Sequence, residues 1–295
     1  MSGFLNVHKP EGLTSHDVVA RVRRHTGVRR VGHTGTLDPF AMGVLVLSLG
    51  KATRLSEFLL GSSKEYRAVV ELGRSTDTYD RTGQVTAEHD PSGVRREDVE
   101  AALARFRGRI LQVPPPFSAI KKEGVPLYRL ARAGKQVQPE PREVQIQRLE
   151  LVAWQPPRLT LEVTCSAGTY IRSLAHDLGQ ALGCGAHLAE LVRLRTGRFR
   201  LEDAVPLEAV LEAEPAVWQA WLHPLEAAVE HLPRVDLRPG EAKRLAHGQP
   251  VRAGEDVPAQ PGDLARAHGP GGELVALVRL DPATRSWRPY KVLAS

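Results

Sequence analysis

The chain has 295 residues, of which 42% are hydrophobic, so it can bury one large core and a smaller one. It has no run of 18 apolar residues, which excludes a membrane-spanning helix, and its first residues lack the basic and apolar regions of a signal peptide. Cys165 and Cys184 have neither metal-binding nor redox spacing. We therefore expect a cytoplasmic protein without membrane attachment.

The formal net charge of +6 is carried mainly by arginine, and the arginines are unevenly distributed. Residues 21–30 contain five arginines and no acid, residues 193–200 contain four arginines, and residues 201–230 contain seven acids without Lys or Arg. Arginine favours bidentate contacts with phosphates, so this asymmetry indicates one face for a polyanion and another that is only solvated. For each cluster taken singly, a solvated helix face is the alternative.

At the N-terminus, residues 7–12 predict a short strand and a turn. A helix follows, with Thr14 or Ser15 as its cap, Asp17 in its first turn and Gly27 at its end. Its apolar face carries Val18, Val19 and Val22. The arginines of its last turn complement the helix dipole, which explains them without RNA.

The stretch from Gly32 to Gly43 surrounds one carboxylate, Asp38, with glycines and Pro39. Pro39 disfavours a helical backbone at Asp38, and the apolar residues 44–49 that follow have the length of a buried strand. A carboxylate on a stiff loop above a strand is a candidate nucleophile or general base. The alternative is that Asp38 caps a helix with Pro39 at its first position.

Residues 51–60 predict a short helix, and residues 66–72 alternate as a strand with Tyr66 on its apolar face. For Tyr66, a place in the core is the alternative to a functional role. The polar loop 73–83 carries Asp77 and Asp80. These two acids are either paired catalytic carboxylates or turn-forming residues.

Residues 99–106 repeat at helical spacing up to Gly108, and three prolines make residues 114–119 extended. The basic residues 121–124 suit a phosphate-contacting loop, and residues 126–134 predict a short helix. Residues 143–153 and 159–165 predict a hairpin. Its first strand should contain a bulge, because the alternation slips between Ile146 and Leu149.

A strand gives way to a helix at Gly168–Thr169, which places Arg172 in the first helical turn. A cation there opposes the helix dipole, so Arg172 requires an anionic partner. Asp38 is one candidate, and Asp177 or solvent are the alternatives. His176 and His187 have no third ligand at useful spacing, so we expect no metal site.

Residues 202–230 predict acidic helical connections. From Pro233 onward the amino-acid composition changes and becomes rich in glycine and proline. A helix near 241–247 and strands near 274–280 and 290–293 predict a small β-rich domain. We therefore expect an α/β fold of the α+β type. Residues 1–231 should form a largely antiparallel mixed sheet with flanking helices, and residues 232–295 a second domain.

Several motifs in order resemble the TruB family of bacterial tRNA pseudouridine-55 synthases over most of residues 4–200. The matching segments are His8–Ser15, Gly32–Pro39, Lys64–Arg67, Val113–Pro115 with Ser118–Ala119, Gly168–Arg172 and Gly183–His187. Three positions depart from the family pattern. They are Ala167, where lysine is common, Phe117, where tyrosine is common, and Val192, which interrupts a common Leu-Arg-Arg.

The resemblance implies a pseudouridine-synthase fold with a PUA-like RNA-binding domain at the C-terminus. It implies an isomerase that converts uridine 55 in the tRNA T stem-loop to pseudouridine, acting as a monomer without cofactor or metal. The implied catalytic residues are the nucleophile Asp38, its partner Arg172, and Tyr66, which stacks on the base and is a candidate to help remove the C5 proton. The implied pocket contacts are Tyr170, Leu191 and, where the flipped nucleotide leaves its loop, His33.

Chemistry agrees with these implications, because isomerisation of uridine needs a carboxylate and a dry pocket but no redox partner. Arg172 beside Asp38 should lower the pKa of that carboxyl by ~1–3 units. Two rival functions share some of these features. A noncatalytic tRNA-binding or tRNA-folding module would use the same basic clusters, and a hydrolytic RNA glycosidase would also need a carboxylate.

Overall fold

The computed structural model describes residues 1–118, 120–122, 124–126, 139–254, 260 and 262–294. Eleven described strands form one large sheet whose main path runs β14 (Val205–Pro206), β1 (Gly3–Lys9), β3 (Met42–Leu49), β12 (Ala186–Thr196), β4 (Lys64–Leu72), β11 (Arg158–Cys165), β10 (Arg142–Gln155) and β7 (Gly108–Gln112). Three short strands extend it: β2 (Val31–His33), β13 (Phe199–Arg200) and β15 (Leu222–His223). Neighbours are antiparallel except in the pairs β1–β14 and β3–β12, so the expected largely antiparallel mixed sheet is confirmed.

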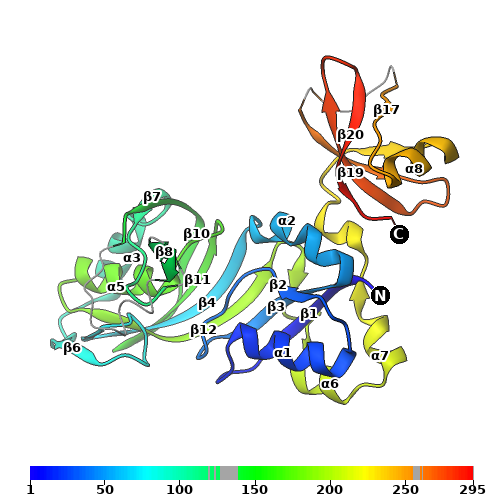
Figure 1. Ribbon diagram of the computed structural model, residues 1–295. Helices are drawn as coiled ribbons and strands as arrows, with labels where there is room; N and C mark the ends of the chain where they lie inside the picture. The colour runs from blue at the N-terminus through cyan, green and yellow to red at the C-terminus, as the bar shows by residue number, and fades with distance from the viewer. Residues whose placement is uncertain (119, 123, 127–138, 255–259, 261, 295) are drawn as a thin grey trace.

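Helices cover the large sheet at both ends. Figure 1 shows β4 and β12 through the middle, with one helical group beside β1 and another beside β10 and β11. The first group is α1 (Ser15–Thr26), α6 (Leu207–Glu212) and α7 (Pro215–Ala220), and the second is α3 (Arg96–Ala104) and α5 (Ile171–Ala181). None of the described helices is long and apolar enough to cross a membrane.

Local sequence signals explain several of these elements. Thr14 caps α1 and shares a capping box with Asp17, while Gly27 ends the helix with φ 68°, as expected. In β4 the even positions from Lys64 to Leu72 are buried, which confirms the predicted alternation. The predicted bulge is also confirmed, because the β10–β11 register shifts between Ile146 and Arg148.

Two expectations need correction. The acidic region 202–230 is not only helical, because β14 and β15 both return to pair with β1. The basic segment near residue 121 contains the strand pair β8 (Lys121–Lys122) and β9 (Val125–Pro126). Ala119, Glu123 and, beyond Pro126, the short helix expected over 126–134 lie outside the described residues.

A second sheet of five strands follows in the C-terminal part of the chain, as expected for a small β-rich unit. Its order is β16 (Arg234–Asp236), β18 (Leu264–His268), β19 (Leu274–Asp281), β20 (Ser286–Val292) and β17 (Val251–Arg252), and it carries α8 (Pro239–Ala246). Two further strands, β5 (Arg74–Thr76) and β6 (Val85–Glu88), form a separate hairpin. The exact boundary at residues 231 and 232 stays a prediction.

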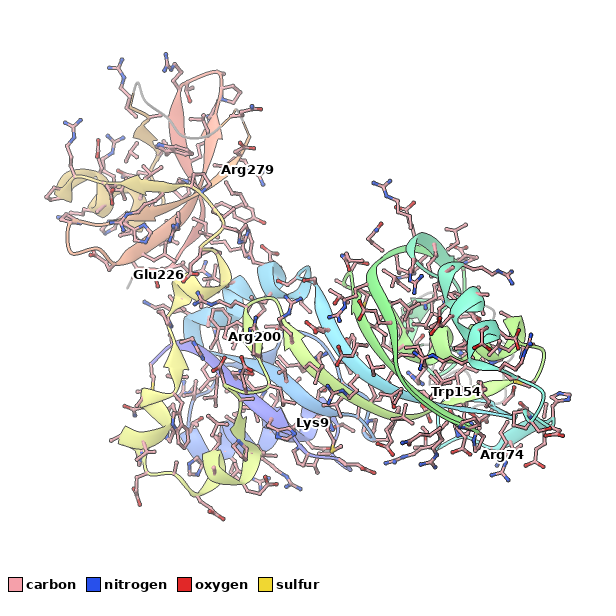
Figure 2. The ribbon with its side chains drawn as sticks, turned by 180° about the vertical axis from the view of Figure 1, so that it is seen from behind. Lys9, Arg74, Trp154, Arg200, Glu226 and Arg279 are labelled. Atoms are coloured by element: carbon pink, nitrogen blue, oxygen red, sulfur yellow. The ribbon has the colours of Figure 1, made fainter. Side chains whose placement is uncertain are left out.

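The two sheets meet through an apolar cluster beside η1 (Gly50–Leu55), α2 (Ser56–Leu60) and η2 (Leu225–Ala228). Phe4 and Leu55 from the large unit pack there with Leu277 of β19 and with Leu293, which follows β20. Figure 2 shows Glu226 at this junction, and its carboxylate lies 3.8 Å from Nε2 of His268. The junction therefore combines an apolar cluster with a polar contact between Glu226 and His268.

Gly43 permits the parallel contact between β3 and β12. Its φ is +105°, and a Cβ built on it would lie 2.3 Å from the backbone oxygen of Arg193. Strand β12 therefore approaches β3 more closely than a side chain would allow.

We predict that Gly43→Ala destabilises the protein by more than the roughly 1–3 kcal/mol of backbone strain alone, because a steric clash adds to it. Gly27→Ala is the matched control, since Gly27 has φ +68° but open space around it. Urea unfolding of both variants measures the difference. Equal losses of stability would show that the close approach at Gly43 is unimportant.

Candidate active site

Asp38 lies in a β-turn at the end of the loop between β2 and β3. The backbone N–H of Ala41 donates to the carbonyl of Asp38 at 3.1 Å, and Pro39 occupies the second position of this turn. No helix begins here, because β3 starts at Met42. The alternative in which Asp38 caps a helix is therefore wrong.

Hydrogen bonds from residues of β1, α1 and the turn between them hold the backbone of this loop. Ser15 Oγ accepts from the N–H of Leu37 at 2.8 Å and lies 3.1 Å from its carbonyl oxygen. The N–H of Gly12 donates to the carbonyl of Pro39 at 2.8 Å, and Lys9 Nζ lies 3.3 Å from the same oxygen. Lys9 is fully buried, and burial lowers the pKa of its amine to about 8. The turn at Asp38 is thus fixed from several directions.

Arg172 reaches this turn from the first turn of α5. Its Nη2 donates to Asp38 Oδ1 at 3.2 Å and its Nε lies 3.0 Å from Oδ2, so the guanidinium faces both carboxylate oxygens. The same guanidinium donates through Nη1 to Asp80 Oδ2 at 3.3 Å and to the carbonyl of Thr78 at 3.2 Å, and through Nη2 to the carbonyl of Phe117 at 3.0 Å. The expected contact between Arg172 and Asp38 is confirmed, and Arg172 is only 6% exposed, which excludes solvent as its partner.

The two acids of loop 73–83 differ in what they do. Asp77 accepts from the N–H of Gln84 at 2.8 Å and serves the turn. Asp80 is 3% exposed and accepts from Thr78 Oγ1, Thr82 N and Thr82 Oγ1 at 2.6–2.9 Å while it pairs with Arg172. Turn formation therefore accounts for Asp77, and Asp80 also anchors the arginine.

Burial raises the pKa of the Asp38 carboxyl above its ordinary value of 3.8, and Arg172 offsets only part of this rise. The second carboxylate, Asp80, adds to the rise because its negative charge disfavours another nearby. Arg172 lowers this pKa, as expected, but burial outweighs its effect, so the pKa of Asp38 is raised overall. The arginine limits the cost of ionising a desolvated carboxylate and does not reverse it.

A cavity of about 480 Å³ opens beside Asp38, and several predicted residues line it. Tyr66 comes from β4, Leu191 from β12, and Tyr170 and Arg172 from the start of α5. Tyr66 is 8% exposed, so it is both a core residue and a wall of the cavity. His33 is not among the lining residues in the described part of the chain; its Nδ1 accepts from the N–H of Gly35 at 3.3 Å.

The two tyrosines of the cavity are uncharged hydrogen-bonding groups at neutral pH. Burial raises the pKa of both Tyr66 and Tyr170 above the ordinary value of 10.0. Arg193 lies close to the Tyr66 phenol and opposes this rise. Their rings provide flat apolar faces, which suit a planar aromatic ligand.

Arg193 is a site residue that sequence reasoning missed. The chain pattern assigns it to a basic surface cluster, yet it is 2% exposed and lines the cavity. Its guanidinium donates to the carbonyls of Val44 at 2.7 Å, Gly35 at 3.0 Å and Thr36 at 3.3 Å. A usable signal existed, because Arg193 follows Leu191 by two positions and so shares its face of β12.

The rest of the second arginine cluster is neutralised by acids. Arg195 pairs with Glu65 at 3.0 Å, Arg200 with Glu202 at 3.3 Å, and Arg198 with Glu230. This cluster is thus not a bare phosphate-binding surface. In the first cluster, by contrast, four exposed arginines make no ion pair with any described residue: Arg21, Arg24, Arg29 and Arg30.

The two histidines considered as metal ligands contact different groups. His176 stacks on Tyr79 with ring centroids 3.8 Å apart, and His187 Nδ1 lies 3.2 Å from the carbonyl oxygen of Arg74. Among the residues that the structure describes, no three His, Cys, Asp or Glu side chains are placed to share a metal ion. The arrangement at Asp38 can supply a desolvated carboxylate, a fixed cation and stacking surfaces.

We predict that Arg193→Met lowers the free energy of unfolding by about 3 kcal/mol, since one buried and two part-buried carbonyls lose their donor at roughly 1–3 kcal/mol each. Arg200→Met is the matched control, because its exposed ion pair is worth about 1 kcal/mol or less. Chemical denaturation of the two variants gives the comparison. A loss at Arg193 no larger than at Arg200 would contradict this account of the loop.

Comparisons with known proteins point to one family. Residues 23–171 match the family described as TruB family pseudouridylate synthase (N terminal domain), and residues 172–230 match the tRNA pseudouridylate synthase B C-terminal domain. A relative from Pelotomaculum thermopropionicum named tRNA pseudouridine synthase B is 44% identical and covers 100% of this chain and 98% of its own. A relative of the same name from Syntrophotalea carbinolica is 43% identical, with 98% of this chain and 95% of its own covered.

Solved structures agree with the sequence relatives. The structure of an H/ACA RNP bound to a substrate RNA containing 2'-deoxyuridine has a TM-score of 0.74 and 28% identity, covering 99% of this chain and 85% of that one. A Cbf5-Nop10-Gar1 complex has the same TM-score at 30% identity, covering 98% and 84%. The similarity therefore extends over both sheets.

Proposed function

The chain belongs to the TruB family of pseudouridylate synthases, and on this premise we propose that it isomerises uridine 55 in the T loop of tRNA. Membership makes it an isomerase that forms pseudouridine in tRNA. We further propose that Asp38 is the nucleophile and that no cofactor takes part. The observation that carries the proposal is the Asp38 carboxylate, gripped by Arg172 at the wall of a cavity with two tyrosines.

The chemistry requires that the bond from the base to the ribose breaks, the base turns, and C5 joins the sugar carbon. An ionised carboxylate can attack the base or the sugar to start this sequence. In our proposal Arg172 orients Asp38 and keeps a useful fraction of it ionised despite burial. The cavity keeps the freed base in place while water is excluded.

The aromatic wall fits a flipped nucleobase. We assign stacking on the uracil to Tyr66, worth roughly 1–3 kcal/mol, which is comparable with the few kcal/mol that unstacking a base costs. Tyr170 and Leu191 complete the pocket in this assignment, and His33 contacts the RNA beside the extruded nucleotide. Because burial raises the pKa of Tyr66, its phenol holds its proton before the substrate binds.

Binding of tRNA should depend on Arg21, Arg24, Arg29 and Arg30 of α1 and the following loop, which make no ion pair with any described residue. Phosphate contacts of this kind supply most of the affinity and weaken with salt. We also propose that residues 232–295 act as a PUA-like RNA-binding domain. Five arginines line a hollow between α8 and β20 there: Arg238, Arg244, Arg252, Arg285 and Arg288. We expect the enzyme to be a cytoplasmic monomer.

Two other functions would fail specific tests. A noncatalytic tRNA-binding module needs no ion pair between Asp38 and Arg172, and it would leave uridine unchanged. A hydrolytic glycosidase would free uracil and leave an abasic site. Isomerisation keeps the mass of the RNA constant, so mass spectrometry separates it from hydrolysis.

We predict that Asp38→Asn abolishes release of tritium from tRNA labelled at C5 of uridine. Wild-type protein should release it, because C5 exchanges its hydrogen for a bond to the ribose. Asp77→Asn is the matched control, since Asp77 is a turn carboxylate that does not contact Arg172. Full tritium release by Asp38→Asn would refute the proposed nucleophile, and release of free uracil by wild type would refute isomerisation.

We predict that activity declines on acidification at a pH above that of an ordinary aspartate, because the pKa of Asp38 is raised and its protonated form cannot attack. Arg172→Gln removes the cation that opposes this rise, so the acid limb of the profile should move to still higher pH. Single-turnover rates measured from acidic to neutral pH test both statements. A limb that moves to lower pH in the variant would contradict them.

A further inference from the structure

Gln112 is a buried amide that the mechanism above does not use. It is the last residue of β7, the edge strand of the large sheet, and it is 2% exposed. Its Nε2 donates to the backbone carbonyl of Tyr170 at 3.0 Å, and its Oε1 accepts from the backbone N–H of Tyr170 at 2.8 Å. One side chain therefore satisfies both backbone groups of a residue that lines the cavity.

This contact supplements the first hydrogen bond of α5, in which the N–H of Leu174 donates to the carbonyl of Tyr170. Tyr170 precedes α5 with an extended backbone, φ −99° and ψ 109°, and its own side chain makes no capping hydrogen bond. The amide of Gln112 pairs with it much as a neighbouring strand would. Without that amide, the N–H of Tyr170 would lose its partner in a part-buried site, and its carbonyl would keep only the helical bond from the N–H of Leu174 at 3.1 Å.

The residues after Gln112 also form hydrogen bonds with the first turn of α5. The carbonyl of Val113 accepts from Ser173 Oγ at 2.7 Å, and the carbonyl of Phe117 accepts from Arg172 Nη2 at 3.0 Å. The segment 112–117 thus holds three of the four residues from 170 to 173. Two of these, Tyr170 and Arg172, face the cavity beside Asp38.

We propose that Gln112 is a positioning residue for the reaction, which rests on the roles proposed above for Asp38, Tyr170 and Arg172. By holding the backbone of Tyr170, Gln112 sets the direction in which the tyrosine ring enters the cavity. It also fixes the first turn of α5, from which Arg172 meets Asp38. Its effect is on geometry at the reacting base, and Gln112 itself does not touch the cavity, since it is not among the described lining residues.

Two substitutions separate the parts of the contact. Gln112→Glu keeps the size and one acceptor but presents an oxygen to the carbonyl of Tyr170 where Nε2 donated. Gln112→Met keeps the length and removes both hydrogen bonds without adding charge. Gln180→Glu is the matched control, because Gln180 is an exposed amide on α5, the helix whose first turn Gln112 contacts.

Each variant is assayed for the single-turnover rate of tritium release at saturating C5-labelled tRNA, for tRNA Kd by filter binding, and for thermal unfolding. We expect the saturating rate of both Gln112 variants to fall roughly 10- to 100-fold, the range that a small misplacement of reacting groups produces. The Kd should change little, and assays are run below the unfolding transition of each variant. Gln180→Glu should match wild type.

The outcomes distinguish this inference from the proposed function. If Gln112→Met is folded and reacts at the wild-type saturating rate, the inference is overturned. It is overturned equally if the loss appears only in Kd, since a positioning role acts on the rate. If Asp38→Asn is itself fully active, the proposed function fails first, whatever the Gln112 variants do.

Discussion

The geometry of the site depends on the contacts that the buried guanidinium of Arg172 makes. It joins Asp38 on the loop before β3, Asp80 on the loop after β5, and the carbonyl of Phe117 on the segment after β7. Two of these segments adjoin strands of the large sheet and the third belongs to the β5–β6 hairpin, and one rigid, five-donor group can bind them together. Two carboxylates thus face one buried cation. Burial and the charge of Asp80 raise the pKa of Asp38. The arrangement therefore holds the carboxylate of Asp38 in place but makes it harder to ionise.

Other buried cationic side chains hold the backbone of the loops around the cavity. They are not regular strands, so their carbonyls need donors that a ladder would otherwise supply. Lys9 serves the carbonyl of Pro39, Arg193 serves those of Gly35 and Thr36, and Lys64 Nζ donates to that of Leu60 at 2.6 Å. Burial lowers the pKa of both lysines to about 8, which shows how strongly these ammonium groups are desolvated. The active-site backbone is therefore held by side chains whose charge is hidden from water.

Charge that remains at the surface has a different distribution from the one in the sequence. The arginines within residues 193–200 are buried or paired with acids, and two of those acids, Glu202 and Glu230, lie in the acidic stretch that follows. Arg21, Arg24, Arg29 and Arg30, on α1 and the loop after it, remain exposed without an ion pair to any described residue. A polyanion would therefore meet a narrower basic surface than the count of arginines indicates.

Several local features of this chain could be predicted from the amino-acid sequence because they depend on short-range interactions. The capping box at Thr14, the alternation through Tyr66 and the bulge after Ile146 each depend on neighbours a few residues away, and each is found. Motif resemblance also drew attention to Asp38, Arg172 and the residues of the cavity. Only the tertiary structure revealed Asp80, Arg193 and Gln112 as supports of the site. Their partners lie far along the chain, and the direction of the Asp38 pKa shift depends on desolvation, which exists only after the chain has folded around the carboxylate.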